Sequence, residues 1–132
     1  MKKIAVLLLI GLILTGCGNK EYFKQIYLED MKSYMDEDKD GFVLVVTENN
    51  EPFQEYVKDV AESEKVEIAM YNVYESEEGA EDERPVVPFD EIERFSELYY
   101  LEDGKMKNGL AVKDYQDTKL TEEITRFVNL HK

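Results

Sequence analysis

The longest apolar stretch of the chain lies at its start. Ile4 to Leu14 contains no charged or polar side chain, and Lys2 and Lys3 precede it. A run of this length behind a short basic segment is typical of the apolar core of a secretory signal peptide, and it is too short to span a bilayer comfortably. We therefore expect residues 1–16 to be removed and to take no part in the fold.

Helical and strand periodicities alternate through the rest of the chain. The pattern predicts, in order, helix, strand, helix, strand, short helix, strand, strand and helix, over residues 20–35, 42–47, 52–61, 66–73, 89–95, 98–101, 105–113 and 120–128. Residues 75–84 are mostly acidic and are expected to form a solvated loop. The run at 42–47 is almost entirely apolar, which is typical of a strand buried on both faces.

The connections between these elements predict one α/β domain. The strands at 42–47 and 66–73 are joined through a helix, which implies a parallel pair with a right-handed crossover. Asp103 and Gly104 stand between the last two strands, and Asp-Gly is a strong signal for a tight antiparallel hairpin. The expected architecture is a central mixed sheet of about four strands flanked by helices.

Leu14-Thr15-Gly16-Cys17 closes the first apolar run. These residues resemble the lipobox of bacterial lipoproteins, in which an aliphatic residue and small residues precede the lipidated cysteine. The resemblance implies that Cys17 carries a diacylglyceryl thioether and acyl chains such as palmitate, and that it anchors the chain outside the cell membrane. Residues 17–19 would be a lipidated tether, and 20–132 the folded domain. An ordinary secretory signal with an incidental cysteine is the alternative.

Cysteine usage and charge exclude several classes of function. Cys17 is the only cysteine, so a lipidated chain has no disulfide, thiolate zinc site or cysteine nucleophile. The chain has 30 acidic and 16 basic residues, a net charge of −14. Such a domain repels nucleic acid and anionic lipid surfaces, so we expect no nucleic-acid partner. The acidity either keeps the tethered domain in solvent or attracts cations or a basic partner.

The order of the elements resembles the thioredoxin-like fold over roughly residues 20–132. The local match is closest in FVLVVTENNEPF at 42–53, which looks like the family's central strand and the start of its active-site helix. Residues 98–130 look like the family's last two strands and closing helix. The resemblance therefore covers the whole domain in topology and two of its segments in local pattern.

The residues that carry the chemistry of that family are absent here. Its C-x-x-C motif falls on Asn50-Glu51-Pro52-Phe53, and Ser96 stands at about the position of its cis-proline. Because disulfide exchange needs two sulfurs, the resemblance implies a redox-inactive domain that docks a protein or peptide at Asn50 to Phe53, beside Ser96. Within this surface Asn50 and Glu51 are expected to be exposed, whereas Phe53 begins an apolar helical stripe and is expected in the core.

Asp36, Asp38 and Asp40, followed by Gly41, have the D-x-D-x-D-G spacing of a calcium-binding loop. Three carboxylates at alternate positions can converge on one cation. The twelfth position of such a loop is Thr47, where a bidentate acidic ligand is needed. Weak calcium binding and a plain exposed turn are the two interpretations.

Few other residues offer chemistry. His131, the sole histidine, is the penultimate residue and is expected at a frayed helix end, which excludes histidine-based triads. No catalytic residue is assigned, and no cofactor is expected other than weakly bound calcium. The sequence predicts a membrane-anchored binding module rather than an enzyme. A calcium-dependent cell-envelope binding protein and an enzyme using carboxylates in an unrecognised arrangement are the alternatives.

Overall fold

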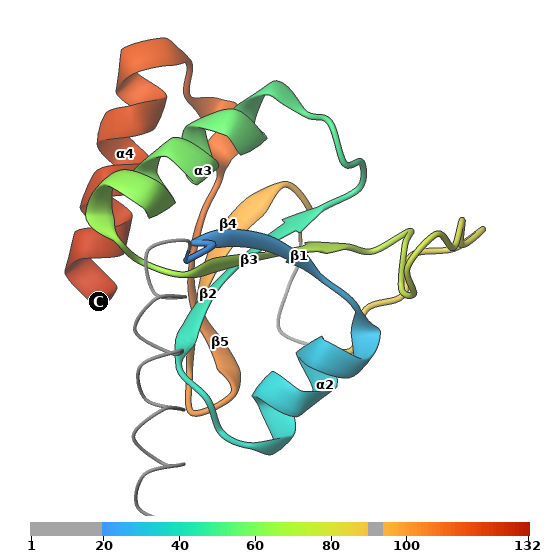
Figure 1. Ribbon diagram of the computed structural model, residues 1–132. Helices are drawn as coiled ribbons and strands as arrows, with labels where there is room; N and C mark the ends of the chain where they lie inside the picture. Colours follow the sequence, from blue (N-terminus) through green and yellow to red (C-terminus); the bar gives the residue numbers. More distant parts are fainter. Residues whose placement is uncertain (1–19, 90–93) are drawn as a thin grey trace, which may run out of the picture.

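A computed structural model describes residues 20–89 and 94–132 of the chain. In this part five strands form one sheet, and helices lie on both of its faces (Figure 1). The elements are β1 (Phe23–Ile26), α2 (Leu28–Asp36), β2 (Gly41–Val46), α3 (Pro52–Glu64), β3 (Ile68–Asn72), β4 (Glu97–Glu102), β5 (Lys105–Leu110), a 3₁₀ turn (Val112–Asp114) and α4 (Asp117–His131). None of the described helices is long and apolar enough to cross a membrane.

The sheet is mixed, with the strand order β1-β3-β2-β4-β5. β1, β3 and β2 are parallel, β4 is antiparallel to β2, and β5 is antiparallel to β4. The predicted parallel pair and the predicted antiparallel hairpin at the sheet edge are therefore confirmed. Since β5 runs in the same direction as β1, β2 and β3, these four strands finish at the same end of the sheet.

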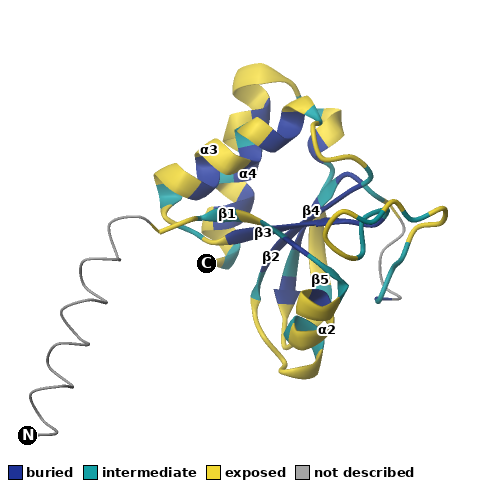
Figure 2. Cartoon of the chain, turned by 45° about the vertical axis from the view of Figure 1, so that its right-hand side comes forward, coloured by how far each residue is buried: buried dark blue, intermediate teal, exposed yellow. Residues whose placement is uncertain are grey.

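Each face of the sheet is covered by its own hydrophobic cluster. The strands at the centre of the sheet are accordingly mostly buried (Figure 2). Successive side chains of a strand point to opposite faces. In β2, Phe42 and Leu44 pack beneath α3 and α4, whereas Val43 and Val45 belong to the cluster that contains Met31 of α2. The apolar run at 42–47 is thus a central strand buried on both faces, as the sequence predicts.

The prediction of one helix over 20–35 is wrong. The chain forms β1 first, and α2 begins only at Leu28. Tyr22 O accepts a hydrogen bond from Ile68 N at 2.7 Å, and β1 then pairs in register with β3. Long-range pairing outweighs the local helical period, because β3 is buried on both faces and would otherwise form an apolar sheet edge. The sheet therefore has five strands rather than about four.

The predicted hairpin turn between β4 and β5 is confirmed, and it is tied to the loop before β2. Asp103 and Gly104 have φ values of 53° and 75°, as a tight hairpin turn requires. Asp103 N donates to Asp40 Oδ1 at 2.8 Å, and Gly104 N donates to Lys39 O at 2.9 Å. The loop at 36–40 and the hairpin therefore support each other.

The remaining boundaries agree in part. The helices beginning near Pro52 and ending near the C-terminus are confirmed as α3 and α4. The last strand ends at Leu110, because Val112 turns into the core. The expected short helix at 89–95 falls largely on 90–93, outside the described residues, as do the expected signal peptide and tether over 1–19.

Candidate functional site

A groove lies at the end of the sheet where β2 and β5 finish. It forms where α3 and α4 begin, because α3 follows β2 and α4 follows β5 through the 3₁₀ turn. Its volume is about 430 Å³. The residues that line this α3–α4 groove are Glu51, Pro52, Phe53, Tyr56, Val112, Lys113, Tyr115, Gln116, Asp117 and Leu120.

The α3–α4 groove has an apolar floor and aromatic walls. Phe53, Val112 and Leu120 are buried members of the core beneath it. Tyr56 and Tyr115 are half-buried and pack against the same cluster. Tyrosine presents an apolar ring together with a polar hydroxyl, which is a common composition for a binding surface. The groove therefore suits an apolar side chain of a partner.

One polar contact joins the starts of the two helices. Tyr56 Oη donates to Asp117 Oδ1 at 3.2 Å. This hydrogen bond and the charge of Asp117 raise the pKa of Tyr56, because both favour the protonated hydroxyl over the phenolate. Among the described residues lining the groove, Glu51 and Asp117 are the carboxylates and Lys113 is the cation. The groove is thus apolar at its floor and charged at its rim.

Only some of the residues that the thioredoxin resemblance indicated line the α3–α4 groove. Glu51, Pro52 and Phe53 line the α3–α4 groove. Phe53 is buried, as expected, whereas Glu51 is half-buried rather than exposed. Asn50 is exposed but is not one of the lining residues. Ser96 is only 4% exposed, and its N–H donates to Val45 O at 2.7 Å. Ser96 therefore fixes the start of β4 and offers little surface to a partner.

The lining residues from the other side of the groove were missed by the sequence analysis. Tyr115, Gln116 and Asp117 come from the connection between β5 and α4. The only feature of the sequence that marks this wall of the groove is a short polar segment with hydrophobic residues on either side. The antiparallel course of β4 and β5 returns this connection to the end of β2, which no local pattern reveals.

A second feature that was missed is an amide–carboxylate network at the ends of the parallel strands. Glu75 Oε1 accepts hydrogen bonds from Asn49 Nδ2 at 2.7 Å and from Gln25 Nε2 at 3.0 Å. Asn49 Oδ1 accepts from Asn72 Nδ2 at 2.8 Å, and Glu75 Oε2 accepts from Gly79 N at 2.9 Å. The bonds from Asn49 and Gly79 lower the pKa of Glu75. In the sequence, this network could have been indicated by Asn49 and Asn72, which are polar residues near the ends of two predicted strands.

A hollow of about 440 Å³ lies beside this network. Glu48, Glu75, Glu81 and Asp82 line it, and none of the described lining residues is basic. Asp82 Oδ2 accepts a hydrogen bond from Ser76 N at 2.8 Å, and Glu75 is held as described above. Because the carboxylates of Glu75 and Asp82 accept hydrogen bonds from the chain itself, we interpret the network as a structural support for the acidic loop.

The three aspartates of the possible calcium loop are not gathered around one point. Asp36 is the last residue of α2, and Asp40 Oδ1 accepts from the hairpin. Over residues 20–89 and 94–132, no three His, Cys, Asp or Glu side chains are grouped in a way that could hold a metal ion. Calcium binding by Asp36, Asp38 and Asp40 stays a prediction that only a titration can test.

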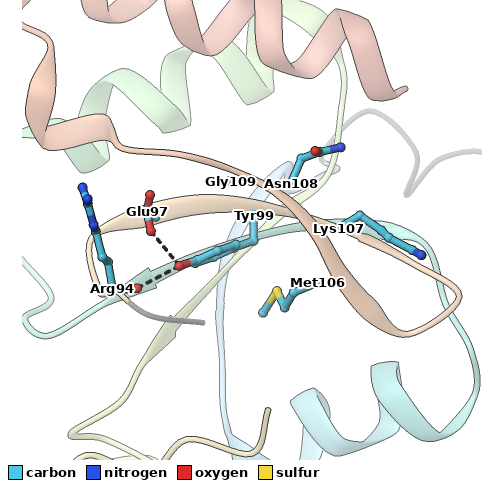
Figure 3. A pocket seen from close by; sticks show the side chains of 7 residues that line it. All are labelled: Arg94, Glu97, Tyr99, Met106, Lys107, Asn108 and Gly109. Carbon is cyan, nitrogen blue, oxygen red and sulfur yellow. Dashed lines mark hydrogen bonds between the residues drawn. The ribbon is translucent and has the colours of Figure 1, made fainter. Parts of the chain in front are cut away.

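A further pocket lies over β4 and β5, on the face that α2 covers (Figure 3). Tyr99 Oη lies 2.7 Å from Glu97 Oε2 and 2.9 Å from Arg94 O. Burial and the contact with Glu97 raise the pKa of Tyr99, so its hydroxyl is a donor. A Cβ on Gly109 would lie 2.9 Å from the Tyr99 ring. In Figure 3 the side chains of Arg94 and Lys107 extend in different directions, so they do not converge on one ligand.

The expectation of a frayed end at His131 is wrong. Its ring stacks on Tyr100 with 4.6 Å between centroids, and it lies 4.9 Å from the Phe127 ring. This packing holds the last turn of α4 against the sheet. The sole histidine therefore has a structural position.

Comparisons with known proteins identify no relative. No protein-family model matches the chain, and no curated protein matches it.

Proposed function

We propose that this chain is an extracytoplasmic lipoprotein whose domain is a redox-inactive member of the thioredoxin-like fold that binds a protein or peptide. The order of elements supports the fold assignment. Two parallel crossovers are followed by an antiparallel hairpin and a closing helix. The positions equivalent to the family's redox motif carry Asn50 to Phe53, which contain no sulfur.

The observation that carries the binding proposal is the α3–α4 groove. Its floor of Phe53, Val112 and Leu120 lies between two tyrosine walls, at the end of the sheet where open α/β sheets commonly bind ligands. An apolar side chain of an extended peptide fits such a floor, while its backbone stays in reach of the rim. The acidic rim residues Glu51 and Asp117 favour a peptide with a neighbouring basic residue.

The lipid anchor is proposed from the sequence alone. The basic start, the apolar run and the LTGC sequence support processing before Cys17. An anchored domain would meet partners outside the cytoplasmic membrane, where an apolar groove without redox chemistry serves capture rather than catalysis.

Photocrosslinking tests the proposed groove. A photoreactive residue at Lys113, which is exposed on the rim, should capture a partner in cells. The same residue at Lys32, exposed on α2 on the opposite face, should not. Tyr115→Ala should weaken capture from position 113, because it removes one wall. Equal capture from both positions, or capture from 113 that Tyr115→Ala leaves unchanged, would show that the groove is not the docking surface.

A further inference from the structure

We infer that the anchored domain turns one end of its sheet towards the lipid surface and presents the α3–α4 groove away from it. This inference rests on the lipid anchor proposed above and deepens it by placing the partner. We call the end where β1, β2 and β3 begin the tether end, and the end that carries the α3–α4 groove the groove end.

The chain joins the sheet very soon after the proposed lipid. Tyr22 O already accepts the hydrogen bond from Ile68 N at 2.7 Å, so the backbone is fixed at this residue. Five residue steps separate Cys17 from Tyr22. A fully extended chain gains at most ~3.5 Å per residue, so Tyr22 can lie no farther than about 18 Å from the lipidated residue. The tether end is therefore held close to the bilayer.

The groove lies at the opposite end of the sheet. β1 begins next to Tyr22 and runs parallel to β2, and the groove residue Glu51 follows the end of β2. A strand of the length of β2 spans about 20 Å. In Figure 1 the first turns of α3 and α4 lie far from the C-terminus, and the last residues of these helices meet through Lys132 and Glu64, 3.3 Å apart. The sheet itself thus separates the groove from the tether.

The charge distribution favours the same orientation. The tether end carries the carboxylates of Asp36, Asp38 and Asp40 and those of the hairpin at 102–103. Three ion pairs at this end partly offset its negative charge: Lys20–Glu67, Lys39–Glu37 and Lys132–Glu64. The acidic loop at 75–84 follows the end of β3 and therefore lies at the groove end. An anionic lipid surface repels charge within roughly 10 Å of it, so it drives the acidic loop away.

The two effects together define where a partner can bind. The tether and the sheet place the groove no more than about 40 Å from the lipid surface, and its opening faces away from the bilayer. The structure thus assigns the groove to a protein or peptide that approaches from outside, within this distance of the membrane, and not to a membrane lipid.

Energy transfer from a labelled cysteine to the lipid head groups tests the orientation. The only native sulfhydryl is proposed to carry lipid, so Glu67→Cys and Glu77→Cys each provide one labelling site, and both replace exposed glutamates. The full lipidated chain is reconstituted in vesicles of phosphatidylethanolamine and phosphatidylglycerol that carry an acceptor on the head groups. We expect transfer efficiency from position 67 to be about twofold or more higher than from position 77, because one strand length separates the two sites.

Each outcome bears on a separate step. Equal efficiencies in a sample that floats with the vesicles would overturn the orientation while leaving the anchor intact. A chain that does not float would overturn the anchor and the inference with it. Inserting about 20 Gly/Ser residues between Asn19 and Lys20 should bring the two efficiencies together, since such a linker reaches roughly 25 Å without a preferred direction. A difference that survives this insertion would show that the tether does not set the orientation.

Discussion

Two glycines with left-handed backbone show how much one Cβ atom can cost. Gly79 has φ of 80° and open space around the Cβ position, whereas a Cβ on Gly104, at φ 75°, would lie 2.5 Å from Met35 O. Gly79→Ala should cost about 1 kcal/mol, the cost of the backbone conformation alone. Gly104→Ala should cost about 1–3 kcal/mol more, because a backbone atom cannot move aside easily.

Urea unfolding measures both losses of stability, provided that the dependence of the unfolding free energy on urea concentration is the same in the substituted and unsubstituted chains. Equal destabilisation by the two substitutions would mean that the hairpin moves away from α2 without loss. In that case the contact between Gly104 and Lys39 is not a rigid one.

Glu75 should make the stability of the domain depend on acid pH. Hydrogen bonds from Asn49 and Gly79 lower the pKa of Glu75 in the folded state, so the folded chain binds this proton less readily than the unfolded chain. The stability it contributes is present above the unfolded pKa and is lost as pH falls through the lower folded pKa. Between about pH 5 and pH 3, Glu75→Gln should therefore lose less stability than the unsubstituted chain.

The matched control for this experiment is Glu77→Gln, an exposed glutamate of the same loop. It should keep the pH dependence of the unsubstituted chain. Urea midpoints at several pH values give the comparison. If Glu75→Gln and Glu77→Gln follow the same curve, the amide–carboxylate network is too loose to hold the carboxylate.

At the scale of elements, what could be predicted depends on the range of the interactions. β2, α3 and α4 follow from local periodicity, and the hairpin follows from Asp103-Gly104. β1 could not be found in this way, because its four residues match a helical period and only the pairing with β3, 45 residues away in register, makes them a strand. A short edge strand is decided by its neighbour rather than by its own sequence.

Shortening the chain tests the role of β1. A chain that begins at Leu28 lacks this strand and exposes the edge of β3, so we expect a loss of more than about 3 kcal/mol or of cooperative unfolding altogether. A chain that begins at Lys20 keeps the strand and should unfold like the full domain. Thermal and urea unfolding measure the stability of the two chains. Equal stability of the chains that begin at Leu28 and at Lys20 would contradict the role of β1 in the fold.

The loop between α2 and β2 carries the calcium prediction. If it binds calcium in the weak extracellular class, with a dissociation constant of about 0.1–1 mM, then 5 mM calcium should stabilise the domain by about 1–2 kcal/mol. Asp36→Asn combined with Asp38→Asn should abolish this shift, and it leaves the hydrogen bond from Asp103 to Asp40 in place. If calorimetry detects no heat of calcium binding and calcium does not raise the melting temperature, the loop is only a turn that supports the hairpin.

At the scale of the whole molecule, the candidate site was half predictable. Glu51 to Phe53 were found through the resemblance of one segment to a known active-site helix. The opposite wall at Tyr115 to Asp117 lies more than 60 residues later, and it reaches the groove only because two antiparallel strands return the chain to the end of β2. Ser96 was placed by the same resemblance, yet its burial depends on the packing of the segment before β4. A tertiary site requires the topology as well as the motif.

The anchor is the property on which the behaviour of the whole molecule depends most, and Cys17 decides it. We expect mass spectrometry of the membrane fraction to show an N-terminal, acylated Cys17 and no peptide from residues 1–16. Cys17→Ala should release the domain from the membrane, because one side chain carries all of the proposed anchoring and the acidic domain has no attraction of its own to anionic lipid. The released domain should retain its melting temperature, since the two hydrophobic clusters described above are formed by residues that follow the proposed tether. Release with an unchanged melting temperature would show that anchoring and folding are independent. An intact segment from Met1 to Gly16 in membrane-bound protein would contradict the lipoprotein proposal, whereas the proposal that the groove binds a peptide would still depend on its own crosslinking test.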